Sequence, residues 1–208
     1  MKIIEALRSA IEIGNLSPGT RLIEKDLCEQ LFVSRTCLRE ALREMQAEGI
    51  LGQGSRGLMV ISISPEDAWN VYRLRSVLEA LVVEQFIERS NDDEMRDLLL
   101  QCEELKAAYN SGNLRAMLDS KRAFYNCICA GARNTIAFDM IIRLVLKTSS
   151  LRARSLQRVA RQQESIREID QLTQAIVSRD VEKARTVAIA HVMNAARSAL
   201  AVDETISV

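Results

Sequence analysis

Apolar residues recur at helical spacing through most of the chain, and the first sixty residues divide into short elements. The segment 2–13 repeats apolar residues every three or four positions and stops at a glycine, a usual residue at a helix C-terminus. A second short helix is expected over roughly 24–31, and a third is capped by Ser34 and ends at Gly49. The stretch 50–63 places two extended runs around a glycine-rich tip and predicts a β-hairpin. Three helices followed by a hairpin form a winged helix-turn-helix.

Beyond Ser64 the pattern changes to long helices. Ser64 can cap a helix, Pro65 suits its first position, and the helix should run to about Arg89. Its apolar residues cover most of its circumference, which predicts a central place in a bundle. Further breaks are expected at Asn91, 112–113, 133–134, about Arg161 and 179–180.

These breaks predict six antiparallel helices joined by short connections. The expected fold class is therefore mainly α, an N-terminal winged helix-turn-helix followed by an antiparallel all-α helical bundle. The expected domains are residues 1–63 and residues 64–208. Only two prolines and eight glycines occur, which fits a chain dominated by helices.

Composition and charge exclude several classes of protein. Lysine plus arginine equals aspartate plus glutamate at 28 each, so no global field attracts nucleic acid or membrane, and any such contact needs a local patch. The five cysteines contain no C-x-x-C pair and lack paired histidines, so they are interpreted as reduced core thiols. No signal sequence and no apolar run of roughly 18 residues is found. We expect a cytoplasmic protein without membrane contact.

A local basic patch lies on the third helix. Arg35, Arg39 and Arg43 are four residues apart and share one face, opposite a predicted buried face. An arginine near the start of a recognition helix can bind guanine with two donors, which discriminates by about 1–3 kcal/mol per pair. The alternative is a solvated face, with Arg39 and Arg43 paired to glutamates of the same helix. The helix-turn-helix layout and the basic hairpin tip favour DNA.

The expected DNA contacts lie on the third helix and on the hairpin. Thr36 can contact a phosphate or a thymine methyl, and Arg56 at the hairpin tip can reach the minor groove or the backbone. The full predicted set is Ser34, Arg35, Thr36, Arg39, Arg43, Arg56 and Gly57.

The residues just described resemble a known family. The segment from "LRSAIEIGNLSPGTRLIEKDL" to "EMQAEGIL", with "GSRGLMV", resembles the DNA-binding domain of the GntR family. The segments "YRLRSVLEALVVE", "RAFYNCICAGARN" and "QLTQAIVSRDVEKAR" resemble the effector domain of its FadR subgroup, called FCD. The sequence departs from the family pattern at three positions, Phe32 for glycine, Cys37 for proline and Cys28 for alanine. If Phe32 is left-handed, its side chain costs on the order of 1–2 kcal/mol.

Many members of this subgroup hold a divalent metal through an aspartate, a histidine four residues later and two further histidines. Alignment of this chain places Lys121 and Tyr125 at the first two positions and Ile169 at the third, and it keeps only His191. A lysine ammonium donates no electron pair to a metal. We therefore expect no metal and no other cofactor.

The same positions suit an anionic small molecule, with a carboxylate paired to Lys121 and bonded by Tyr125 and His191. Arg75 and Asn194 are further candidate contacts. The alternative is that Lys121 reaches solvent or a nearby carboxylate and that His191 is a hydrogen-bonded core residue.

The resemblance implies a ligand-responsive transcription regulator, a repressor that binds a double-stranded DNA operator as a homodimer. The residues Lys121, Tyr125 and His191 predict that its effector is a carboxylate. One rival is a helical adaptor that binds a protein partner without DNA. A second rival is an enzyme built on His191, Tyr125 and Lys121. It is weak because no nucleophile with an adjacent base is visible, so we expect no catalytic residues.

Overall fold

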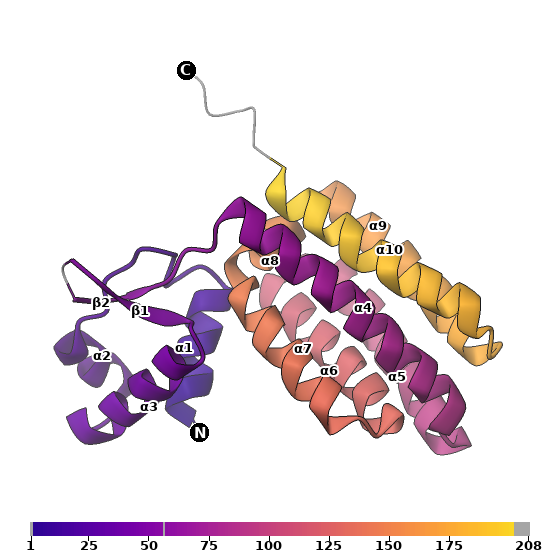
Figure 1. The fold of residues 1–208 in the computed structure, drawn as a ribbon, viewed down its shortest axis with the longest axis horizontal. Coiled ribbons are helices and arrows are strands. Elements are labelled where there is room, and N and C mark those ends of the chain that lie inside the picture. The colour runs from indigo at the N-terminus through magenta and orange to yellow at the C-terminus, as the bar shows by residue number, and fades with distance from the viewer. Residues whose placement is uncertain (1, 56, 202–208) are drawn as a thin grey trace.

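The N-terminal unit is a small head of three helices and a hairpin. The computed structural model describes residues 2–55 and 57–201. Its head contains α1 (Lys2–Glu12), α2 (Glu24–Leu31), α3 (Arg35–Ala47), β1 (Leu51–Gly54) and β2 (Gly57–Val60). The two strands pair antiparallel in register from Leu51 opposite Val60 to Gly54 opposite Gly57. Figure 1 shows this head beside the helical bundle, and the winged helix-turn-helix prediction is confirmed.

The head has its own apolar core. All three helices and both strands contribute to it, and its largest fully buried side chains are Leu38, Met45 and Leu51. Ser34 caps α3 as predicted, since its hydroxyl accepts a hydrogen bond from the backbone N–H of Cys37 at 3.3 Å. Phe32, in the turn before α3, has φ 53° and is left-handed, with 95% of its surface exposed.

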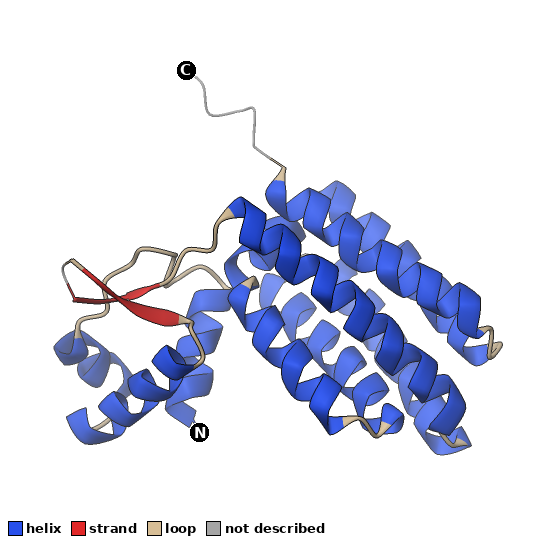
Figure 2. Cartoon of the chain, in the orientation of Figure 1, coloured by secondary structure: helices blue, strands red, loops and turns tan. Residues whose placement is uncertain are grey.

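The second unit is entirely helical over the described residues, as Figure 2 shows. Its helices are α4 (Pro65–Arg89), α5 (Asp92–Asn110), α6 (Leu114–Ala132), α7 (Thr135–Lys147), α8 (Ser149–Leu156), α9 (Val159–Val177) and α10 (Val181–Leu200). The part of the chain that the structure describes thus has seven helices after Ser64, where the sequence predicted six. The chain breaks at Thr148 and at Gln157–Arg158, whereas Arg161 is a buried residue inside α9.

The long helix α4 packs against α6, α7 and α10 and supplies much of the bundle core. It is less central than predicted, because Leu74 and Val77 on one of its faces are 51% and 62% exposed. The apolar residues around α4 thus belong in part to a face that packs in the core and in part to a face that is exposed.

α4 and α6 approach each other closely at Gly131. A Cβ atom at Gly131 would lie 2.5 Å from the Phe86 ring, so this position has no room for a larger residue. The ring of Phe86 fills this space and is fully buried in the bundle core.

No helix among the described residues is both long enough and apolar enough to cross a lipid bilayer.

Candidate functional site

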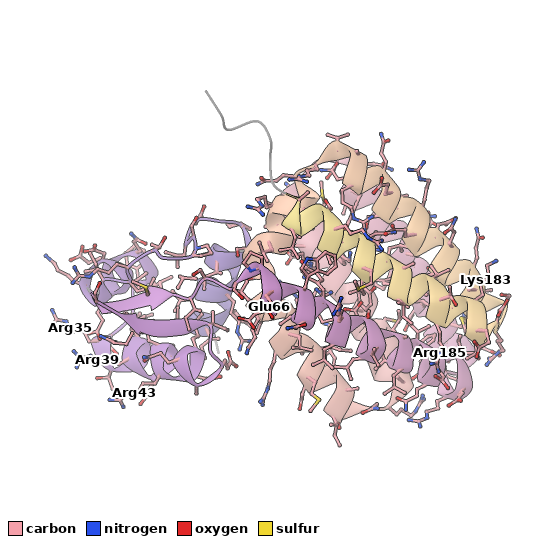
Figure 3. All side chains as sticks on the ribbon, turned by 45° about the horizontal axis from the view of Figure 1, so that its top comes forward. Arg35, Arg39, Arg43, Glu66, Lys183 and Arg185 are labelled. Atoms are coloured by element: carbon pink, nitrogen blue, oxygen red, sulfur yellow. The ribbon has the colours of Figure 1, made fainter. Side chains whose placement is uncertain are left out.

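One face of α3 lies open to solvent and carries the basic residues that the sequence indicated. The opposite face is buried through Leu38, Ala41, Leu42 and Met45, as predicted. Arg35, Thr36, Arg39 and Arg43 are all exposed. Figure 3 shows the three arginines along the outer edge of the head, away from the bundle.

The arginines are little engaged by the rest of the protein. Arg39 donates from Nε to Glu24 on α2 at 2.9 Å, and both side chains are exposed. Neither Arg35 nor Arg43 makes an ion pair or a hydrogen bond with the described residues. Within the described part of the chain, neither Arg39 nor Arg43 pairs with Glu40, Glu44 or Glu48, and Glu48 binds Arg8 instead. An exposed pair such as that of Arg39 contributes little stability and is easily exchanged for a phosphate.

The other predicted contacts differ in their surroundings. Ser34 is exposed and caps α3, and Gly57 begins β2 with φ 116°, a conformation that glycine favours. Arg56 lies outside the described residues, so its expected DNA contact stays a prediction.

The cysteine prediction is wrong for Cys37. It is exposed in the first turn of α3, next to the buried Leu38, because successive helical residues face different directions. Cys102 and Cys129 are buried, and Cys28 and Cys127 are half-buried. All five are free thiols.

A cavity of about 430 Å³ lies between the bundle and α1 of the head. Arg75, Lys121 and Tyr125 line it, so three of the five predicted effector contacts share this cavity. Its apolar wall comes from α7, through Phe138, Ile141, Ile142, Val145 and Leu146. Further cations in its wall are Arg8, Arg115, Arg122 and Arg152. Charged groups on one side and apolar groups on the other suit an anion with an apolar body.

His191 and Asn194 are not part of this cavity wall. Nε2 of His191 lies 2.7 Å from Nζ of Lys121, and Nδ1 lies 2.6 Å from a carboxylate oxygen of Glu168. The amide of Asn194 donates to the other Glu168 oxygen at 2.7 Å. Arg161 also donates to Glu168 at 2.7 Å. The two residues therefore belong to a buried network behind Lys121, centred on Glu168.

The pKa shifts assign the protons in this network. Burial, then the nearby Lys121, lowers the pKa of His191 to about 4. Burial acts to raise the pKa of Glu168, but hydrogen bonds from His191 and Arg161 outweigh it and lower the pKa to about 2. At neutral pH His191 is thus uncharged, with its Nδ1–H donating to the Glu168 carboxylate and its Nε2 accepting from Lys121.

Lys121 is the weakest cation of the cavity. Its side chain is buried, and this burial, followed by repulsion from Arg152 and Arg161, holds its pKa well below the usual range. The neighbouring guanidinium groups are therefore stronger partners for a ligand carboxylate than Lys121, the partner that the sequence predicted.

Arg75 is partly neutralised by a residue that sequence reasoning missed. Its Nε and Nη2 donate to one oxygen of Glu79 at 3.0 and 2.8 Å, and both side chains are buried. Burial, and next the Glu79 charge, raise the pKa of Tyr125 well above its usual range, so Tyr125 keeps its proton. Its hydroxyl is available as a donor to an anion in the cavity.

The residues present do not fit the divalent metal of the FadR subgroup. The Nε2 atom of His191 faces the Lys121 amine, and the other two ligand positions hold Tyr125 and Ile169. Among the described residues no group of three or more histidine, cysteine, aspartate or glutamate side chains is placed to hold a metal.

Comparison with known proteins identifies the family. A model of the FCD domain matches residues 70–194, more than half of the chain, and the model of the gntR family of bacterial regulatory proteins matches residues 1–57. The chain belongs to the GntR family. The FCD match places this GntR-family protein in the FadR-like group, as the sequence resemblance implied.

Relatives of this GntR-family protein are bacterial regulators. The uncharacterized HTH-type transcriptional regulator YdhC of Bacillus subtilis (strain 168) is 32% identical over 113 residues, covering 54% of this chain and 50% of YdhC. The HTH-type transcriptional repressor GlaR of Escherichia coli (strain K12) is 26% identical over 196 residues, covering 90% and 89%. The matched segment thus spans half of YdhC but most of GlaR.

A solved structure of E. coli McbR/YncC has the same fold. Its TM-score is 0.81 at 26% identity, covering 93% of this chain and 92% of that one. The agreement extends over both the head and the bundle.

Proposed function

We propose that this GntR-family protein is a ligand-responsive, DNA-binding transcription regulator that acts in the cytoplasm as a repressor. The observation that carries the proposal is the exposed face of α3, where Arg35 and Arg43 have no partner among the described residues and Arg39 has only an exposed one. Free guanidinium groups on a helix that projects from a compact head suit the major groove. The names of the relatives YdhC and GlaR support regulation and repression.

The DNA proposal is tested on operators selected from a random duplex library with the full chain. Arg35→Ala or Arg39→Ala should lower the affinity for the selected site by roughly 5- to 150-fold, which corresponds to about 1–3 kcal/mol per base contact. Lys183→Ala removes the same charge from the far end of the bundle (Figure 3) and should leave affinity unchanged. If wild type and the three variants bind the selected site with equal affinity, α3 is not the recognition helix.

We propose that the effector is a small anion with a carboxylate, bound in the cavity between α1 and the bundle. The guanidinium groups of Arg75, Arg122 and Arg152 and the Tyr125 hydroxyl support this class of ligand, and α7 would cover its apolar body. Because His191 and Asn194 bind Glu168, we propose that they hold Lys121 in place behind the ligand.

The effector proposal is tested by releasing small molecules from denatured, natively purified protein and by titrating a panel of carboxylates. Arg152→Ala should bind such a carboxylate about tenfold or more weakly than wild type does, since a hydrogen bond to a charged group contributes about 1.5–3 kcal/mol. Arg167→Ala removes an exposed arginine of α9 and is the matched control. Unchanged affinity in Arg152→Ala would place the ligand elsewhere.

We propose a homodimer that joins the α4 and α7 faces of two copies and reads a pseudo-palindromic operator. The support is a set of large apolar side chains exposed on these adjacent helices, Leu74 (51%), Val77 (62%), Ile136 (72%) and Met140 (51%). Val77→Asp should yield monomers in sedimentation equilibrium. The same change at the exposed Leu100 of α5 should not, and a dimeric Val77→Asp protein would exclude this face.

We also propose that the chain divides into a DNA-binding domain of residues 1–63 and an effector domain of residues 64–208, and that it is not an enzyme. Two separate apolar cores support the division, and the names of the relatives support the absence of catalysis. Turnover of a bound carboxylate by purified protein would contradict the second point.

A further inference from the structure

The wall of the proposed effector cavity includes part of the DNA-binding head. Glu5, Arg8, Ser9 and Glu12 of α1 line it together with residues of the bundle. The opposite face of α1 is buried in the head core through Ile4, Leu7 and Ile11. A ligand that fills this cavity therefore touches the bundle and the head at once.

Two polar contacts tie α1 to α6 beside the cavity. Arg122 donates to a carboxylate oxygen of Glu12 at 2.8 Å, and Arg115 donates to the hydroxyl of Ser9. Only 8% of the Glu12 side chain is exposed, whereas half of Arg122 is. A buried carboxylate depends on its cationic partner, because an unpaired buried charge is strongly unfavourable.

A second cation near Glu12 lacks a close partner. Arg152 on α8 lines the same cavity and makes no hydrogen bond or ion pair with the described residues, and its Nε is buried. Glu12 is the strongest attractive charge acting on it, ahead of Glu79. Next to Glu12 the cavity thus presents the guanidinium groups of Arg122 and Arg152, and the carboxylate that attracts them belongs to the protein itself.

We propose that Glu12 is a built-in anionic latch, which holds the head against the bundle through Arg122 and competes with an anionic effector for Arg122 and Arg152. This inference rests on the proposed function of the cavity as an effector site. An entering anion binds the two guanidinium groups, repels the Glu12 carboxylate and leaves it buried without its partner. Arg122 has Asp119 within 3.6 Å, so it can turn away from α1 without losing every counter-charge. Effector binding and attachment of the head therefore oppose each other.

The latch is tested in the full chain by hydrogen exchange at the last turn of α1 and at α8, which faces it. Glu12→Gln should speed exchange there by about tenfold, since it removes the charge of a half-exposed pair. Glu5→Gln removes an exposed carboxylate of the same helix and cavity wall and should leave the rate unchanged. The exchanged pair Glu12→Arg with Arg122→Glu should restore slow exchange. Equal rates in Glu12→Gln and Glu5→Gln would overturn the latch.

Competition is tested with anilinonaphthalene sulfonate, a fluorescent anion with an apolar body. Glu12→Gln should bind it about tenfold more tightly than wild type does, because the internal competitor is gone. Glu66→Gln removes an exposed carboxylate of α4 that does not line the cavity and is the control. Equal affinity in Glu12→Gln and Glu66→Gln would overturn the competition. Operator binding by the same proteins separates the two proposals. A wild type that binds no duplex DNA contradicts the regulatory function, whereas a latch failure with intact DNA binding contradicts only the latch.

Discussion

Replacing Glu168 by glutamine removes a negative charge that three side chains share. Arg161, His191 and Asn194 each bind this carboxylate, at 2.7, 2.6 and 2.7 Å. Glutamine keeps the size of the side chain but has one acceptor oxygen, so it cannot accept all three hydrogen bonds. The main loss is at Arg161, whose charge is then buried without its closest counter-charge.

The structure sets the size of the effect. The Arg161 side chain is 4% exposed and that of Glu168 is 14% exposed, so Arg161 is buried and the pair is shielded from most of the solvent. Removing one partner of such a pair costs about 3–5 kcal/mol. Glutamine still offers one acceptor, and Glu164 lies 3.6 Å from Arg161, so we expect about 3 kcal/mol. For a chain of this length the melting temperature should fall by about 6–12 °C.

Urea unfolding followed by circular dichroism at neutral pH measures this free energy. Glu164→Gln is the matched control, because it lies one turn earlier on α9, is 53% exposed and should cost under about 0.5 kcal/mol. If Glu168→Gln loses no more stability than Glu164→Gln, Glu168 does not compensate the charge of Arg161 and the network described here is wrong.

Three further changes have defined outcomes. His191 is the only histidine, and its pKa in the folded chain, about 4, lies below the ordinary value of 6.5. Between these two pH values the unfolded chain binds a proton that the folded chain does not. The free energy of unfolding should therefore fall by up to about 3 kcal/mol from pH 6.5 to pH 4. The pKa of Glu168, lowered from 4.5 to about 2, adds a further loss of stability below pH 4.5. Urea unfolding midpoints measured against pH report both effects. If the midpoint falls as steeply between pH 6.5 and pH 4.5 in His191→Gln as in wild type, the effect assigned to His191 is refuted. Phe32→Gly should stabilise the head by about 1 kcal/mol in thermal unfolding, because a left-handed, exposed phenylalanine is strained, and a lower melting temperature would contradict this. Gly131→Ala should destabilise by roughly 1–3 kcal/mol in urea through its clash with Phe86, and an unchanged midpoint would contradict the close approach.

The head was predictable because its signals are local. The cap at Ser34, the positive φ at Gly49 and the glycine-rich hairpin tip each act within a few residues, and the structure has the elements where these signals place them. From the sequence, a left-handed Phe32 was only a condition, and the structure shows that this condition is met.

The bundle was less predictable where neither glycine nor proline marks a break. The stretch 148–158 contains neither, so the end of α7 and the separate α8 were missed, and the polar Arg161 was taken for a boundary. Its burial depends on Glu168, a contact that only the folded helix creates. The exposed face of α4 was hidden for a related reason, since an apolar surface residue and a core residue have the same periodicity.

The site was only half visible in the sequence. Arg75, Lys121 and Tyr125 share a cavity. That Arg152 of α8 lines the same cavity, without an ion pair to any described residue, depends on how separate helices pack. The spacing of His191 and Asn194 showed that they share a face but not that Glu168 binds both. The spacing of residues along the sequence does not predict contacts of this kind between separate helices.

The contact between Phe86 and Gly131 affects the proposed effector cavity, although it lies some distance away along the same two helices. Arg75 and Lys121, eleven and ten residues before this contact on α4 and α6, line the cavity, so the two helices run in the same direction. At 1.5 Å per residue the contact lies about 15 Å from the cavity. The Phe86 ring packs directly against Gly131 and so sets the distance between α4 and α6. We expect a larger residue at Gly131 to push the two helices apart and to change the shape of the proposed effector cavity, although neither Gly131 nor Phe86 lines that cavity.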